Sequence, residues 1–199
     1  KVLPYLAETL ERGPKKMVLR DKIFNPFQKQ DMGGKPYCVI VCDNATLERM
    51  IGLEYYQNAT VSIVVDHHAS NEGYGDVNWT EVSEACAENV YHMLDPQCLR
   101  KAAEAEEHPT AADYIYLGIA HDTGGMARAK KSTLLALVDL MSMGVDHGEI
   151  MKTMHSDTLD TLNKRADIIR SARRAMDGKV AYVIMDAKEH TEKKIIYED

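Results

Sequence analysis

The stretch "YCVIVCDNATLERMIGLEYYQNATVSIVVDHH", residues 37–68, decides the fold class of this chain. It opens with a continuous apolar run that ends on Asp43, and it closes with a second apolar run that ends on Asp66. Runs that are apolar on both faces are typical of central strands in a parallel sheet. Between them, the apolar residues of segment 45–56 recur at helical spacing. Strand, helix and strand in this order predict an α/β fold with a parallel β-sheet flanked by helices.

Apolar periodicity and turn residues predict mostly helices in the rest of the chain. Upstream, we expect a helix over residues 2–12 and a strand over residues 15–21. Downstream, we expect a loop, then six helices and a strand, in this order: 74–79, 81–95, 96–108, 111–121, 132–143, 147–155, 158–176 and 179–186. A long helix followed by a fresh strand suggests a second domain that the chain contains only in part.

Capping residues define two of these boundaries. Thr110 and Asp113 have the spacing of a capping box for the helix over 111–121. Ser132 is the expected N-cap of the next helix, and Gly144 is its expected stop.

Composition and charge exclude several classes of protein. With 45% apolar and 28% charged residues, the 199-residue chain can build one sizeable core. Its formal net charge of −7 leaves no broad basic face for duplex nucleic acid, although bound cations would still admit a small anionic substrate. No apolar run reaches membrane-spanning length, and the N-terminus lacks a signal-peptide pattern. Without C-x-x-C spacing, the four cysteines predict reduced, mostly buried thiols in a cytoplasmic protein.

Three polar clusters interrupt the apolar pattern. They are Asp43, then Asp66 with His67 and His68, then His121 with Asp122. Carboxylates at the apolar ends of strands are costly to bury without a partner. Divalent cations would satisfy all three clusters, since carboxylate and imidazole ligands suit Mn²⁺, Mg²⁺ and related ions. Ligands also gather beyond the carboxyl ends of parallel strands, so the coincidence at one edge of the predicted sheet favours a metal site.

Each cluster also has a purely structural explanation. Asp43 precedes the helical segment that starts near Thr46 and could cap it. The turn Asp66–His68 could hold one hydrogen-bonded imidazole. His121 could lie at the favourable end of a helix macrodipole. Pattern alone leaves these explanations open.

The same clusters resemble three known motifs. "VVDHHASNEGYGDVNW" (64–79) resembles the signature of the DHH phosphoesterase superfamily, "VCDNATLERM" (41–50) its preceding Asp motif, and "GIAHDTGG" (118–125) its later D-T-G motif. The order of the motifs is also that of the family. The most similar subgroup is the bacterial oligoribonuclease, pAp phosphatase and cyclic-dinucleotide phosphodiesterase type, in which a DHH domain precedes a DHHA1 domain.

The resemblance implies a site with two Mn²⁺ ions, with Mg²⁺ or Co²⁺ as alternatives. Asp43 would bridge both ions, and His67 and Asp122 would bind the second one. Relatives of this kind use the metals to activate a water molecule for attack on phosphorus.

The resemblance also implies roles around the metals. His68 would be the catalytic residue that faces the substrate phosphate as hydrogen-bond donor or acid. Asp66 would orient a histidine from behind, and His121 is a weaker candidate for contact with substrate.

Two family features are not found in the sequence. The family's first motif, H-x-x-P-D-x-D-A-x-G-S, supplies most ligands to the first metal and does not occur here. The chain also stops just inside the expected DHHA1 domain. We therefore expect a fragment with a DHH domain over 1–157, a linker helix over 158–177 and the start of a DHHA1-like domain over 178–199.

The implied function is a cytoplasmic, metal-dependent phosphohydrolase. The expected substrates are short oligoribonucleotides, linear dinucleotides or pAp, without duplex nucleic acid or membrane as partners, and relatives suggest a homodimer. A manganese pyrophosphatase-like enzyme is one alternative. The other is a catalytically silent nucleotide- or metal-binding module, which applies if the first metal motif is truly absent.

Overall fold

The structure is a computed structural model, and it describes residues 32–105 and 109–185. Contacts within the chain divide it into two compact units, Lys1–His155 and Ser156–Asp199. The helix and strand expected over 2–12 and 15–21 lie outside the described residues, so they stay predictions.

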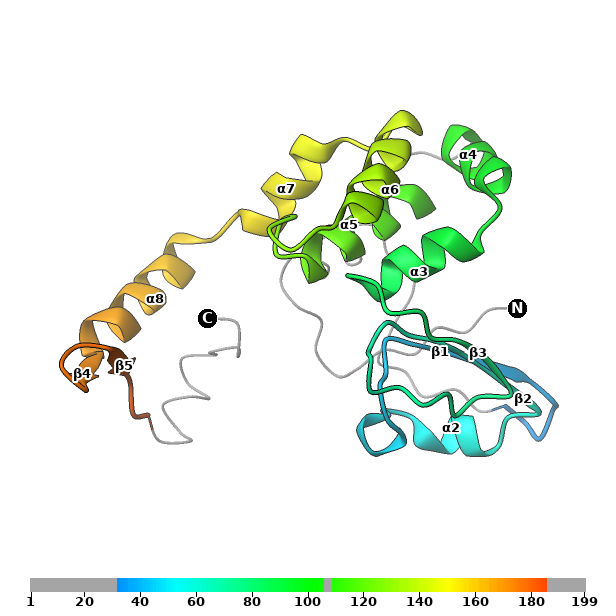
Figure 1. Cartoon of the computed structure of the whole chain (residues 1–199), viewed down its shortest axis with the longest axis horizontal. Helices are drawn as coiled ribbons and strands as arrows, with labels where there is room; N and C mark the ends of the chain where they lie inside the picture. The colour runs from blue at the N-terminus through cyan, green and yellow to red at the C-terminus, as the bar shows by residue number, and fades with distance from the viewer. Residues whose placement is uncertain (1–31, 106–108, 186–199) are drawn as a thin grey trace. The chain divides into compact units, whose positions relative to one another are not determined.

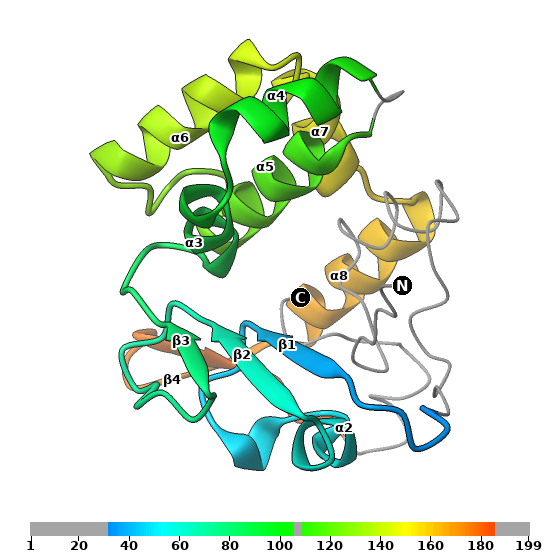
Figure 2. The ribbon, with the colours of Figure 1, turned by 90° about the vertical axis from the view of Figure 1, so that its right-hand side faces the viewer.

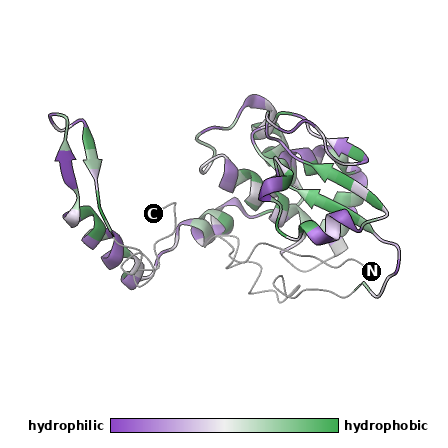
Figure 3. Ribbon diagram, turned by 90° about the horizontal axis from the view of Figure 1, so that it is seen from below, coloured by the Kyte–Doolittle hydropathy of each residue, from purple (hydrophilic) through white to green (hydrophobic). Residues whose placement is uncertain are grey.

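The predicted parallel sheet is confirmed in the first unit. It has the strand order β1 (Cys38–Cys42), β2 (Val61–Val65) and β3 (Val77–Trp79), and all pairs are parallel. Its strands are largely hydrophobic (Figure 3). Cys42 pairs with Val65, and Val65 pairs with Trp79. This register aligns the carboxyl ends of the three strands, which is the edge where a parallel sheet presents ligand-binding residues.

The expected burial on both faces holds for the end of β2, where Val64 and Val65 are buried, but not for its exposed first residue, Val61, nor for β1. Along β1 exposed and half-buried residues alternate, and Ile40 is 62% exposed. Cys38 and Cys42 lie on the same exposed face. Cys98 is also exposed and only Cys86 is buried, so the expectation of mostly buried thiols was wrong, although all four are free.

The expected loop around 74–79 instead contains strand β3. Side-chain hydrogen bonds explain the difference. The backbone N and Oγ of Ser62 in β2 both donate to Asp76 Oδ2, at 2.8 Å each, and Asp76 N donates to Ser62 Oγ at 3.0 Å. This reciprocal pair holds the chain beside β2 just before Val77, where the strand starts.

The connection from β1 to β2 is two short helices, not the single helix expected over 45–56. A 3₁₀ helix, η1, covers Leu47–Arg49, and α2 covers Leu53–Gln57. Gly52 separates them with a φ of 79°, in the left-handed region that glycine adopts at little cost. The apolar spacing predicted helical structure here but not the break, and none of the residues of η1 and α2 is fully buried.

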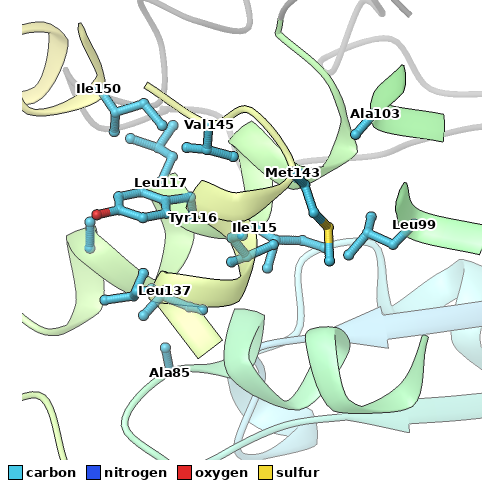
Figure 4. Close-up of a cluster of buried hydrophobic side chains, with 14 residues drawn as sticks. Ala85, Leu99, Ala103, Ile115, Tyr116, Leu117, Leu137, Met143, Val145 and Ile150 are labelled. Carbon is cyan, nitrogen blue, oxygen red and sulfur yellow. The ribbon is translucent and has the colours of Figure 1, made fainter. Parts of the chain in front are cut away.

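Among the described residues of the first unit, five further helices follow the sheet: α3 (Cys86–Met93), α4 (Pro96–Ala105), α5 (Ala111–Asp122), α6 (Lys131–Ser142) and α7 (His147–His155). Figures 1 and 2 show α2 on one side of the sheet and α3 on the other. The largest apolar cluster lies among the helices around α5, where Tyr116, Ile119 and Leu140 are almost fully buried (Figure 4). Helix α5 is therefore a rigid support for the residue at its C-terminal end, Asp122.

The cap predictions were partly right. The capping box of Thr110 and Asp113 is present at the start of α5, and Gly144 follows α6 with a φ of 101°. Ser132 is not the N-cap of α6. The N–H of Leu134 bonds the carbonyl of Lys130 at 3.0 Å, so the helix already begins at Lys131 and Lys130 is its N-cap.

In the second unit, α8 (Leu159–Ser171) is shorter than the helix expected to reach Met176. Residues Arg173–Ala175 form β4, which pairs antiparallel with β5 (Val180–Tyr182). The turn between them places Met176, Asp177 and Gly178 at positive φ, which a helix cannot accommodate. The segment 158–177, predicted to be one linker helix, therefore contains a helix and then the first strand of a hairpin. No helix in the described parts of the chain is long and apolar enough to span a bilayer.

Candidate metal centre

Asp43 lies directly after β1, at the carboxyl edge of the sheet. Its backbone N–H continues the pairing of the strands by donating to the carbonyl of Val65 at 3.0 Å, and its φ of 57° is in the left-handed region. Asp43 does not cap η1, whose N-cap is Thr46 and has no side-chain cap hydrogen bond. Asn44 Oδ1 accepts the N–H of Thr46 at 3.2 Å, in a turn just before the helix. The half-exposed Asp43 carboxylate is thus left to face the residues after β2.

His67 lies between two carboxylates. Its Nε2 is 3.4 Å from Asp43 Oδ1 and 3.9 Å from Asp122 Oδ2. Its Nδ1 is 3.1 Å from the backbone carbonyl of Ser83. Because a carbonyl can only accept, Nδ1 must carry a proton, and Nε2 is the ring nitrogen that faces the carboxylates. A neutral ring with its proton on Nδ1 is the tautomer that a histidine needs to bind a metal through Nε2.

The imidazole of His68 turns its Nδ1 toward two carboxylates. Its Nδ1 is 2.8 Å from Asp66 Oδ1 and 3.8 Å from Asp43 Oδ1. The hydrogen bond to Asp66 raises the pKa of His68. Partial burial lowers this pKa, whereas the negative charges of Asp43 and Asp122 raise it further. His68 can therefore hold a proton beside the site, as a general acid must.

Asp66 is fully buried behind the histidines, with 0% exposure. Burial opposes its ionisation, but hydrogen bonds from His68, Asn71 and the backbone of His67 outweigh that effect and lower the pKa of its carboxyl group. The Asn71 contact runs from Nδ2 to Asp66 Oδ2 at 2.7 Å. This charged, fully bonded carboxylate contacts the imidazole of His68, whereas it contacts His67 through the backbone.

Asp122 arrives from a different element, as the last residue of α5. Burial and the nearby negative charge of Asp43 raise the pKa of its carboxyl group, which His67 counteracts in part. Arg128 donates to the backbone carbonyl of Asp122 and holds the end of the helix. His121 precedes Asp122 in the last turn, half-buried, and its role at the site stays a prediction.

This donor set fits a divalent cation. One donor atom each from Asp43, His67 and His68 lies within 4.8 Å of the other two, and Asp122 adds a carboxylate beside His67. The Asp122 carboxylate, whose pKa is raised by burial and by the nearby Asp43, gains from a cation placed between the two. The structure thus brings together the predicted ligands Asp43, His67 and Asp122, and it places His68 close enough to act as a further ligand.

Sequence reasoning missed three contributors to the site: Asn71, the backbone of Ser83, and Asn89. Asn89 is 2% exposed on the inner side of α3, and its Nδ2 donates to the carbonyls of Asp66 and Glu81. A polar residue one turn after Cys86, on the buried side of the predicted helix, was a signal that could have revealed it. The carbonyl of Ser83 has no signature in the sequence, since every residue has one.

Comparison with known proteins supports the same class of protein. No family model matches the chain. It is 26% identical over 154 residues to the bifunctional oligoribonuclease and PAP phosphatase NrnA of Bacillus subtilis, covering 73% of this chain and 46% of that protein. It is 28% identical over 135 residues to the probable bifunctional oligoribonuclease and PAP phosphatase NrnA of Streptococcus mutans, covering 65% and 41%.

A crystal structure of an exopolyphosphatase-related protein from Bacteroides fragilis matches with a TM-score of 0.65 at 18% identity, covering 80% of this chain and 48% of that one. At this identity the match shows the fold. The two sequence relatives agree with the motif resemblance to DHH phosphoesterases. The chain spans less than half the length of either curated relative, at 46% and 41%.

Proposed function

We propose that the protein is a metal-dependent phosphohydrolase that cleaves short oligoribonucleotides, linear dinucleotides or pAp. The observation that carries the proposal is the setting of His67, whose Nε2 faces Asp43 and Asp122 while Ser83 fixes the proton on Nδ1. The names of the two sequence relatives support the nucleotide substrates. The ion we expect is Mn²⁺, with Mg²⁺ or Co²⁺ as alternatives, because the donors combine carboxylate and imidazole.

The chain's residues divide the work of such a reaction. Asp43, His67 and Asp122 would hold the metal, with Asp43 bridging to a second ion in a complete site. Bound metal ions of this kind lower the pKa of a water molecule and neutralise charge on a phosphoryl group. Asp66 keeps the Nδ1 side of His68 occupied, so the Nε2 side remains to donate a hydrogen bond or a proton to substrate.

We further propose a homodimeric, cytoplasmic protein that binds single-stranded or mononucleotide substrates and not duplexes. The free cysteines and the net charge of −7 support the location and the exclusion of duplexes, respectively. The dimer rests on family resemblance.

The decisive experiment measures hydrolysis by the protein encoded by the complete reading frame, with and without Mn²⁺. The substrates are pApA, pAp and pyrophosphate, and the variant Asp122→Asn is compared with Asp95→Asn, whose exposed carboxylate lies at the start of α4. We expect Mn²⁺-dependent turnover of pApA or pAp, lost in Asp122→Asn and kept in Asp95→Asn.

Other results would favour other functions. Turnover of pyrophosphate alone would favour a manganese pyrophosphatase-like enzyme. Tight binding of one metal ion without turnover of any substrate would favour a silent binding module and would overturn the proposal.

A further inference from the structure

The tautomer of His67 depends on a short segment that lies outside the DHH turn, Asp66–His68. Residues 81–83 run between β3 and α3, and the carbonyl of Ser83 accepts the Nδ1 proton of His67 at 3.1 Å. A carbonyl displaced by more than a few tenths of an ångström would lose this hydrogen bond. The proton would then be free to move to Nε2, the atom that faces Asp43 and Asp122.

Packing alone does not hold this segment. A cavity of about 210 Å³ borders it and is lined by Glu81, Val82, Ser83 and the α3 residues Glu88 and Asn89, among others. Val82, in the middle of the segment, is 66% exposed. A segment with a cavity on one side must be positioned by hydrogen bonds, because it lacks the contacts that fix a core residue.

Asn89 supplies two of these hydrogen bonds, and the Ser83 Oγ supplies another by donating to the carbonyl of Ala85 at 2.9 Å. The Nδ2 of Asn89 donates to the carbonyl of Asp66 at 2.8 Å and to the carbonyl of Glu81 at 2.7 Å, so both amide protons are used. Both acceptors are carbonyls, which fixes the orientation of the carboxamide. One side chain thus ties the residue just before His67 to the residue two positions before Ser83.

We propose that Asn89 is a positioning residue for the metal centre: it holds segment 81–83 against the DHH turn so that Ser83 keeps His67 protonated on Nδ1. Asn89 acts through Ser83 and His67 and does not contact the metal or substrate. The expected effect of Asn89 on metal binding rests on the proposed function. The expected effect on the tautomer of His67 does not depend on any activity.

The test compares Asn89→Leu, which keeps the volume and removes both donors, with Tyr91→Phe. Tyr91 lies on the same helix and donates one hydrogen bond, to Asp139 Oδ2 at 2.8 Å. The first measurement is the ¹⁵N spectrum of the imidazole nitrogens in the metal-free full-length protein at pH 8, with His67 assigned by its loss in His67→Gln. The second is the dissociation constant of Mn²⁺ measured by titration calorimetry.

We expect His67 to be protonated on Nδ1 in the wild type and in Tyr91→Phe, and to show an admixture of the Nε2–H form in Asn89→Leu. Mn²⁺ binding should weaken about 10- to 100-fold in Asn89→Leu alone, as for other groups that orient a metal-binding histidine. If Asn89→Leu does not fold, Asn89→Ser makes the same comparison, because its shorter side chain fits the space and cannot reach both carbonyls.

An Asn89 variant that folds and keeps both the wild-type tautomer and the wild-type Mn²⁺ affinity would overturn the inference. If the wild type fails to bind Mn²⁺, the proposed function fails, and the tautomer still decides the positioning role of Asn89.

Discussion

The close contact between α3 and α5 allows a quantitative test, because these two helices carry Asn89 and Asp122. Gly118 of α5 faces Ala87 of α3, and a Cβ built on Gly118 would lie 2.7 Å from the Ala87 Cβ. Two carbon atoms pack best at about 3.5–4.0 Å. In Gly118→Ala the helices must therefore move apart by about 1 Å, and the two halves of the site with them.

The expected free-energy changes follow from this clash. Overpacking costs about 1–3 kcal/mol, and the better helix propensity of alanine returns about 1 kcal/mol, so Gly118→Ala should lower stability by about 0–2 kcal/mol. Ala87→Gly should cost about 1–2 kcal/mol through helix propensity and one lost methyl contact. The double variant moves the methyl group from α3 to α5 and should be close to wild type. The two substitutions should thus show a coupling of about 1–4 kcal/mol.

The assay is urea unfolding of the four proteins of this cycle. The chain has a single tryptophan, and because Trp79 lies in β3 its fluorescence reports on the first unit. Additive effects of the single variants, within about 0.5 kcal/mol, would refute the clash as the cause. We also expect Gly118→Ala to weaken Mn²⁺ binding more than the double variant does, since only the single variant displaces Asp122.

Three further predictions concern single side chains. Asp43→Ala should abolish Mn²⁺ binding in calorimetry without shifting the urea midpoint, because the carboxylate is half-exposed. His68→Ala should keep the metal but lower the hydrolytic rate about 10²- to 10⁴-fold; equal metal loss in both variants would contradict this division of roles. Thr110→Ala removes the cap of α5 and should lower the free energy of unfolding by about 0.5–2 kcal/mol, while an unchanged midpoint would show that Asp113 alone suffices.

The parallel sheet and the start of α5 could be predicted because local signals agreed there with the tertiary structure. Two apolar runs, each closed by an aspartate, predicted β1 and β2, and the Thr110–Asp113 box marked the start of α5. Local signals failed where a contact distant in sequence decided the outcome. Strand β3 depends on hydrogen bonds between Ser62 and Asp76, fourteen positions apart.

The end of α8 was missed for a related reason. The stripe of apolar residues continues past Ser171 at helical spacing, but the backbone enters a hairpin whose pairing partner lies after the turn. Periodicity reports which side chains share a face, and it cannot show that a strand partner competes with the helix for the same backbone N–H groups.

The sequence by itself determined which residue types meet at the sheet edge. Strand ends place Asp43 and Asp66–His68 there, and the coincidence of these polar clusters at one edge of the sheet favoured a metal site. Only the tertiary structure decided how the two histidine rings are oriented. His67 presents Nε2 because the Ser83 carbonyl takes its Nδ1 proton, and His68 turns its Nδ1 to the buried Asp66. Such orientations depend on backbone atoms and buried partners brought together by folding, and residue identity does not encode them.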